Sequence, residues 1–155
     1  MKYMSPEEKL KELGVDLPEA PKPLGSYVPC IQTGQLVFLS GMLPMTNGRL
    51  IRTGRVGENI TIDEAKEDAR KTVINALAAL RAHTGSLDKV RRCVKIVGYI
   101  ASASDFTEQP VVLNAASDFL FEVFGEAGRH SRVAVGVNVL PLHSPMEIDF
   151  IFEVS

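Results

Sequence analysis

The strongest constraint on the fold is the last stretch of the chain, residues 146–154, in which the side chains alternate in character. Every second residue is apolar, and the residues between them are mostly acidic: Met146, Ile148, Phe150, Phe152 and Val154 alternate with Glu147, Asp149, Ile151 and Glu153. Successive side chains of a strand point to opposite faces of a sheet. The pattern therefore predicts a half-buried strand with one face on a core.

The apolar stretch before it, residues 130–141, is interrupted by a single arginine, Arg132. A guanidinium presents a fixed fork of donors that matches a carboxylate, and it is rarely buried without a purpose. If the last two strands pair, Glu147 reaches the same space and could orient a water molecule or carry a proton. The alternative is a structural ion pair between Arg132 and Glu147 or Asp149.

Three segments carry the signals of helices. Residues 61–84 open on a capping box and repeat apolar side chains at helical spacing. Residues 110–125 begin at a proline, carry an apolar stripe and end at a glycine. Residues 5–14 begin with a capping serine followed by proline and end at a glycine, so a short N-terminal helix is expected there.

Three further strands are predicted upstream of the last two. Residues 26–31 and 36–40 are expected to be strands separated by a connection at residues 32–35, and residues 90–101 are rich in β-branched side chains. The order of the elements indicates an α+β two-layer fold, a mixed sheet with two long helices on one face. The uncovered face of such a sheet would be apolar in a chain that is 45% hydrophobic, so self-association is expected.

Length and composition narrow the organisation and the partners. The 155 residues suit one domain, 25–155, preceded by the N-terminal helix and a proline-rich connector over 1–24. A net charge of −2 with scattered basic residues makes nucleic acid an unlikely partner. The N-terminus lacks a signal-peptide core and no stretch has the length to span a bilayer, so no membrane is expected and the location is expected to be cytoplasmic.

No cofactor or metal is expected from the sequence. Cys30 and Cys93 share no close spacing with each other or with a histidine, and buried reduced thiols are expected. The three histidines, His83, His130 and His143, lie far apart and lack the spacing of metal ligands.

Polar groups gather where the first two strands begin or end. Tyr27 lies near the start of the first, and Ser40 and Gly41 lie at the end of the second. These groups suit a small polar ligand, although a serine or glycine there is also typical of a turn. Ser40 has no histidine and aspartate partners in its sequence context, which excludes a serine hydrolase.

With these residues in hand, the chain resembles the Rid family of reactive intermediate deaminases, also called YjgF-type or L-PSP endoribonuclease-like proteins. The resemblance covers residues 25–154. The interval of 15 residues from Arg132 to Glu147 and that of 13 residues from Tyr27 to Ser40 match the family pattern. The motifs that carry it are Gly25-Ser26-Tyr27-Val28, Leu39-Ser40-Gly41-Met42-Leu43-Pro44, Asn114, Arg132 with Val133 and Val135, Leu140-Pro141 and Met146-Glu147-Ile148.

The resemblance implies a chorismate-mutase-like fold, a homotrimer with a central β-barrel, and clefts between the subunits. It implies hydrolysis of small enamines and imines, such as 2-aminoacrylate and 2-iminopropionate, to 2-oxo acids and ammonia. Arg132 would hold the substrate carboxylate and Glu147 would position or activate water. The remaining substrate-binding positions would be Tyr27, Ser40, Gly41, Asn114 and Ala134.

The chain departs from the family pattern at two positions near the arginine. Two residues before Arg132 the family usually has proline or alanine, and here stands His130. Two residues after it many members have cysteine, and here stands Ala134, which excludes a thiol role. Two other functions stay open: a trimeric sensor or carrier that binds small carboxylates without turnover, and an endoribonuclease or translation inhibitor. The lack of a basic stripe and of paired histidines argues against RNA cleavage.

Overall fold

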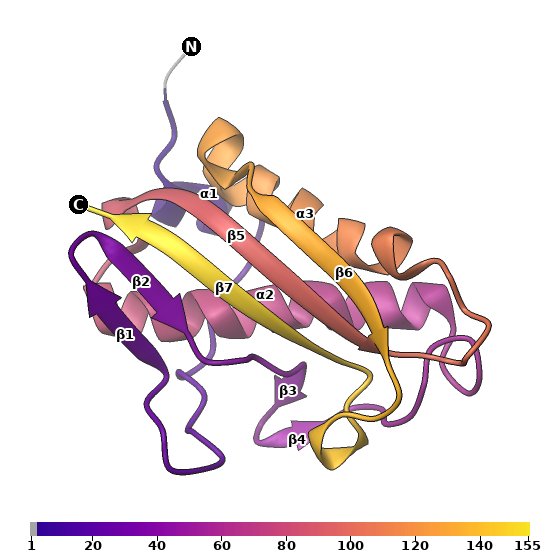
Figure 1. The fold of residues 1–155 in the computed structure, drawn as a ribbon. Helices are drawn as coiled ribbons and strands as arrows, with labels where there is room; N and C mark the ends of the chain where they lie inside the picture. Colours follow the sequence, from indigo (N-terminus) through magenta and orange to yellow (C-terminus); the bar gives the residue numbers. More distant parts are fainter. Residues whose placement is uncertain (1–2) are drawn as a thin grey trace.

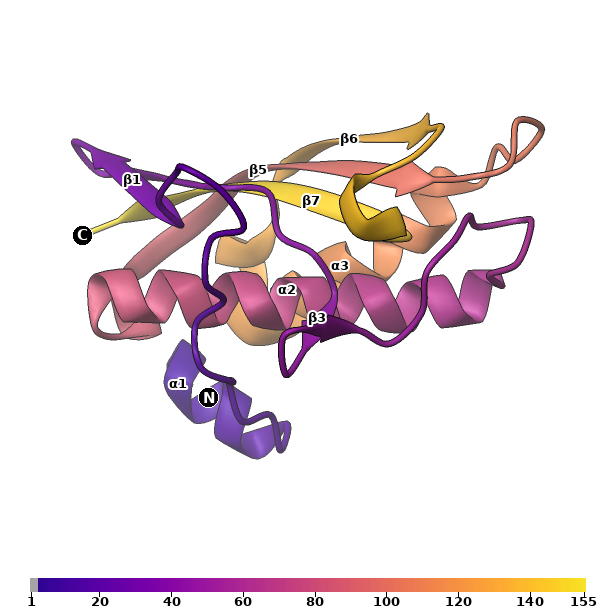
Figure 2. The ribbon, with the colours of Figure 1, turned by 90° about the horizontal axis from the view of Figure 1, so that it is seen from below.

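The computed structural model describes residues 3–155 and has two layers, a sheet and a layer of helices (Figures 1 and 2). The five-stranded sheet has the order β1-β2-β7-β5-β6, with β5 and β6 parallel and the other neighbours antiparallel. The predicted α+β fold with a mixed sheet and two long helices on one face is thereby confirmed. The strands of the sheet are β1 (Cys30–Thr33), β2 (Leu36–Leu39), β5 (Val90–Ala101), β6 (Ser131–Val137) and β7 (Met146–Val154), and the long helices are α2 (Ile62–Thr84) and α3 (Gln109–Phe124).

Smaller elements complete the chain. A short hairpin follows β2, and single 3-10 turns precede β5, follow α3 and precede β7. The hairpin consists of β3 (Met45–Thr46) and β4 (Arg49–Leu50), and the 3-10 turns are η1 (Leu87–Lys89), η2 (Gly125–Gly128) and η3 (Pro141–His143). The remaining element is the short N-terminal helix α1 (Pro6–Glu12). Among residues 3–155, no helix has both the length and the apolar character that crossing a membrane requires.

Helix α2 begins and ends where the sequence predicts. The Thr61 hydroxyl accepts a hydrogen bond from the backbone N–H of Glu64 at 3.2 Å, which satisfies one of the free donors of the first turn. Gly85 ends the helix in the left-handed conformation, with φ of 87°, and its N–H donates to the Arg81 carbonyl. The left-handed conformation favours glycine because it has no Cβ.

The first hairpin differs from the prediction. Strand β1 begins at Cys30 rather than Ser26, and the connection to β2 is a two-residue turn rather than four residues, because Thr33 pairs with Leu36. The turn needs a positive φ, which Gly34 provides at 58°. Residues 26–29 are therefore not a strand but the end of the connector that leads into the sheet.

Strands β6 and β7 do not pair with each other, because β5 lies between them. The condition under which Glu147 would reach the space around Arg132, pairing of the last two strands, is therefore not met. Helix α3 carries the chain from the end of β5 back to the start of the parallel strand β6 (Figure 1), while β7 returns antiparallel on the other side of β5. Arg132 and Glu147 thus belong to strands that are two positions apart in the sheet.

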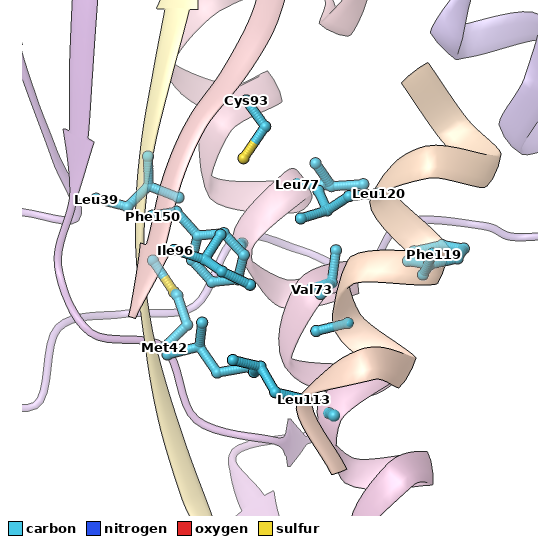
Figure 3. Packing of buried hydrophobic residues seen from close by; sticks show 14 of the residues in the cluster. Leu39, Met42, Val73, Leu77, Cys93, Ile96, Leu113, Phe119, Leu120 and Phe150 are labelled. Atoms are coloured by element: carbon cyan, nitrogen blue, oxygen red, sulfur yellow. The ribbon is translucent and has the colours of Figure 1, made fainter. Parts of the chain in front are cut away.

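The core lies between the sheet and the two long helices (Figure 3). Ile96 and Phe150 come from neighbouring strands, Val73 and Leu77 come from α2, and all are fully or almost fully buried. Cys93 lies in this core, and burial raises its pKa to about 12. Cys30 is half-buried at the edge of the core, and burial raises its pKa to about 11. Both cysteines are free thiols, as predicted.

The opposite face of the sheet is covered by no helix or strand of residues 3–155 (Figure 2). The registers of the strands place both apolar and charged side chains there, since paired residues point to the same face. Several apolar side chains on this face are well exposed, at 58% for Ile31, 40% for Phe38, 43% for Val133 and 38% for Val135. We call this surface the open face.

Helix α1 is anchored to the rest of the chain. Leu10 is buried in the core cluster, and the carboxylate of Glu7 accepts from the N–H of Leu87 at 3.0 Å and pairs with Arg81 at 3.2 Å. The N–H of Glu7 donates in turn to the carboxylate of Asp88. The N-terminal helix therefore docks on η1 and the end of α2. The proposed domain boundary at residue 25 stays a prediction.

Candidate active site

The side chain of Arg132 points toward α3. Arg132 pairs with Ile96, which is fully buried under the helices, so both side chains lie on the helix side of the sheet. Its guanidinium donates to the Ser117 hydroxyl at 3.0 Å and to the Pro110 carbonyl at 3.2 Å. Both acceptors are neutral. Within residues 3–155 Arg132 forms no ion pair, so a structural pair with Glu147 or Asp149 of the same chain is absent.

Arg132 opens onto a pocket of about 420 Å³ between α3 and the start of β6. This volume lies within the range of pockets that bind small molecules. Two of the predicted site residues, Arg132 and Asn114, meet here. The full lining is Asn114, Ser117, Asp118, Phe121, Gly128, Arg129, His130 and Arg132. We call it the Arg132 pocket.

Ala134 follows Arg132 by two residues on the same face of β6. It is half-buried and packs against the core cluster, and it is not part of the pocket lining. In one chain, therefore, this predicted substrate-binding position serves packing.

Glu147 lies on the open face. It pairs with Tyr99, one of the residues of β5 that point away from the helices. Its carboxyl group rests on the backbone of Gly41, where a Cβ would come within 2.8 Å of the carboxyl carbon. Only glycine leaves this space, which explains the residue type. No donor in residues 3–155 bonds to this carboxylate, and burial raises the pKa of Glu147, with a further contribution from the negative charge of Asp149.

The hydroxyls of Ser40 and Tyr27 hold the connector against the end of β2. The Ser40 hydroxyl donates to the Val28 carbonyl at 2.6 Å, and the Ser40 N–H donates to the Pro29 carbonyl at 2.9 Å. The phenolic oxygen of Tyr27 accepts from the N–H of Leu24 at 3.0 Å. These residues form a second group with Gly41 and Glu147, and about half of the Tyr27 side chain stays exposed.

The predicted site residues thus fall into two groups that do not meet within one chain. Arg132 pairs with Ile96 and Glu147 pairs with Tyr99, three residues farther along β5. With about 3.3 Å per residue and about 4.8 Å per strand, their Cα atoms lie about 14 Å apart, and their side chains leave the sheet on opposite faces.

Four polar residues of the pocket were missed by sequence reasoning: Ser117, Asp118, Arg129 and His130. The Ser117 hydroxyl lies 2.9 Å from Nε2 of His130, and Nδ1 of His130 lies 2.7 Å from the Gly128 carbonyl. Burial lowers the pKa of His130, and the charge of Arg132 lowers it further, against a raising effect of the Gly128 hydrogen bond. A signal was present in the sequence: Ser117 stands three residues after Asn114, on the same face of a helix.

Comparison with known proteins decides the family. The family model described as "YjgF/chorismate mutase-like, putative endoribonuclease" matches residues 7–154. The chain belongs to the YjgF family, also called the Rid family. The match begins in α1, so the YjgF pattern extends farther toward the N-terminus than the motifs from Gly25 onward indicated.

Individual proteins resemble the chain over most of its length. Protein TCP17 of Trypanosoma cruzi is 38% identical over 94% of this chain and 92% of that protein. A solved structure of a protein of unknown function from Agrobacterium tumefaciens is 42% identical, covers 97% of this chain and 92% of that chain, and superposes with a TM-score of 0.90. A 2-iminobutanoate/2-iminopropanoate deaminase of Dermatophagoides farinae is 28% identical over 88% of this chain and 92% of that protein. The predicted chorismate-mutase-like fold is thereby confirmed.

Proposed function

We propose that the protein hydrolyses small enamine and imine intermediates of the 2-aminoacrylate and 2-iminopropionate class to 2-oxo acids and ammonia. The observation that carries the proposal is that Arg132 forms no ion pair within residues 3–155. Its guanidinium is half-buried, is held by two neutral acceptors and faces a pocket of about 420 Å³. A partly buried cation without a counter-ion is ready for an anion, and the planar fork fits a carboxylate.

Asn114 and Ser117 lie on the same pocket wall and offer further hydrogen bonds to a small ligand. The substrate would therefore bind by its carboxylate at Arg132, with the imine carbon held at a fixed place beyond it. Fixing the orientation of the reacting carbon is a large part of what such a reaction needs from a protein. The deaminase relative from Dermatophagoides farinae supports this reaction class.

The water molecule needs a base, and Glu147 suits that role in its environment. The carboxylate has no donor bonded to it within residues 3–155, and its raised pKa brings it closer to the range in which it can take a proton and return it. The oxygen of water would bond to the imine carbon as Glu147 takes a proton from it. Glu147 would pass this proton to the imine nitrogen, which gives a neutral carbinolamine. The carbon–nitrogen bond of the carbinolamine would then break as its hydroxyl group becomes the carbonyl and the hydroxyl proton moves to the departing nitrogen, leaving a 2-oxo acid and ammonia.

Arg132 and Glu147 can serve one substrate only if they come from different subunits, since they lie on opposite faces of one sheet. We propose a homotrimer in which the open faces line a central barrel and Glu147 of one subunit faces Arg132 of its neighbour. The exposed apolar side chains of the open face, Ile31, Phe38, Val133 and Val135, support self-association. A cytoplasmic location is part of the same proposal.

The test is the release of 2-oxo acid and ammonia from imines generated in situ by an amino-acid oxidase. Wild type should accelerate release, and Arg132→Ala should abolish the acceleration. Arg49→Ala is the matched control, because Arg49 is an exposed arginine of β4 outside both groups. Equal rates with and without wild-type protein, across imines of different side chains, would contradict the proposal.

A second function has one observation in its favour. Within one chain the Arg132 pocket is complete as an anion site, whereas Glu147 is absent from it. A protein that binds small carboxylates without turnover, as a sensor or carrier, would need only this pocket. Binding of 2-oxo acids that depends on Arg132, together with no acceleration of imine hydrolysis, would decide for this function.

A further inference from the structure

His130 and Ser117 form a hydrogen-bonded chain that ends on Arg132. The Gly128 carbonyl can only accept, so the proton of a neutral His130 ring sits on Nδ1, which donates to it at 2.7 Å. Nε2 is then an acceptor, and the Ser117 hydroxyl donates to it at 2.9 Å. With its single proton used, the Ser117 oxygen presents only lone pairs to Arg132, whose guanidinium donates to it at 3.0 Å.

The position of the Arg132 guanidinium therefore depends on His130, although His130 forms no hydrogen bond with it. The other restraint on the guanidinium, the Pro110 carbonyl at 3.2 Å, comes from the first turn of α3. The two acceptors thus hold the guanidinium between two turns of α3. A rotation of the Ser117 hydroxyl would change the first of them.

We propose that His130 is a positioning residue for Arg132, acting through Ser117, and that protonation of His130 strengthens carboxylate binding in the Arg132 pocket. This proposal rests on the function proposed above. A protonated His130 carries a proton on Nε2 and donates to Ser117 instead of accepting. The Ser117 oxygen then accepts from both His130 and Arg132, and its own proton becomes free for a ligand carboxylate. The pocket also gains a further positive charge close to Arg132.

Other charged groups lie near His130, and their effect on ligand binding has to be distinguished from that of His130. Asp118 of α3 and Arg129, which follows η2, line the same pocket, and Arg129 pairs with Glu126 at 3.0 Å. Lys95, which pairs with Ser131, points to the open face. In the proposed trimer Glu147 of a neighbouring subunit also faces the pocket, so its titration has to be removed by measuring in a Glu147→Gln background.

The experiment is calorimetric titration of the full chain with pyruvate, a 2-oxo acid that stays ionised throughout the range. In the Glu147→Gln background, pyruvate should bind more tightly near pH 5 than near pH 7.5. If binding raises the pKa of His130 by about one unit, the gain approaches but does not exceed about tenfold. Adding His130→Gln, whose amide oxygen can still accept from Ser117, should remove this pH dependence and keep the affinity measured near pH 7.5. Asp118→Asn is the control that should keep the pH dependence.

The outcomes separate this inference from the proposed function. An unchanged pH dependence in His130→Gln, or none in the parent, overturns the role of His130 and leaves the carboxylate clamp intact. Absence of pyruvate binding at both pH values, or binding that survives Arg132→Ala, overturns the proposed role of Arg132 in holding the carboxylate. Should His130→Gln fail to fold, the ring signals of His130 in an NMR titration decide: the pKa must rise when pyruvate is bound, and an unchanged pKa overturns the proposal.

Discussion

Arg132 and Glu147 lie on opposite faces of the same sheet, two strands apart, with β5 between them. The register accounts for this: Arg132 stands beside the buried Ile96, whereas Glu147 stands beside Tyr99, an odd number of residues farther along β5. Each therefore belongs to a different surface of the subunit. The chemistry proposed for the pair depends on how two subunits bring these surfaces together.

The open face should be the surface of self-association. Val133 is 43% exposed on β6, an edge strand of this face, so Val133→Lys should leave the subunit folded and yield monomers, because a charge would have to be buried between subunits. Light scattering measures the mass. Ile51→Lys, at an exposed apolar residue outside the sheet, should leave the mass unchanged. A wild type that is already monomeric, or a Val133→Lys variant with the wild-type mass, would contradict this assignment of the interface.

Gly41 should act on the reaction through Glu147. A Cβ at Gly41 would come within 2.8 Å of the Glu147 carboxyl carbon, so Gly41→Ala must move that side chain. We expect kcat to fall on the order of 10- to 100-fold with a smaller change in KM, because a displaced base affects the reaction more than carboxylate binding.

A double-mutant cycle separates this effect from a general loss of stability. In a Glu147→Ala background, Gly41→Ala should cost little further activity, since the side chain that it displaces is gone. Equal losses in both backgrounds would mean that Gly41 serves the fold alone.

Asp68 should make the stability of the protein depend on pH. Its carboxylate pairs with Arg52 at 3.1 Å, and its other oxygen is buried without a partner among residues 3–155. Burial raises the pKa of Asp68 from 3.8 to about 6, against the opposing charge of Arg52. A carboxyl group whose pKa is raised in the folded state stabilises the fold at pH values below its pKa in the unfolded chain. This stabilisation is lost as the pH rises from about 4 to about 6.

Asp68→Asn removes this titration. From about pH 3.5 to about pH 7 the free energy of unfolding of the variant should therefore rise relative to wild type by on the order of 2–3 kcal/mol. Urea unfolding at each pH measures it. Glu58→Gln is the control, since Glu58 pairs with Arg55 rather than with Arg52 and its side chain is 58% exposed. Its difference from wild type should vary little with pH. A flat difference for Asp68→Asn would contradict the buried-carboxylate account.

The sequence predicts the elements of this fold better than their neighbours in the sheet. The bounds of α2 follow from the capping threonine and Gly85, and β5 spans residues 90–101 as predicted. The predicted start of the first strand was wrong because pairing with β2, and not local composition, decides where β1 begins. The order of β5, β6 and β7 could not be predicted from local patterns, since it depends on the path of α3.

The site was predicted as a set of residues rather than as an arrangement. Arg132 and Asn114 do meet in one pocket, and Gly41 does adjoin Glu147. The separation of the two groups depends on register, which the alternation within one strand does not reveal. Ser117 and His130 were missed because a helix residue and a residue before a strand come together only in the folded chain.

The most direct test of the central claim is complementation between two impaired variants. Arg132→Ala should lack imine hydrolysis and Glu147→Gln should keep only a small residual rate. Mixed oligomers formed by co-expression should regain activity, because some clefts then combine an intact Arg132 with an intact Glu147 from the neighbouring subunit. For randomly mixed cyclic trimers the expected recovery is about a quarter of the wild-type rate. Mixed oligomers that regain no activity would show that the two residues do not meet across a subunit boundary, and would contradict the shared site.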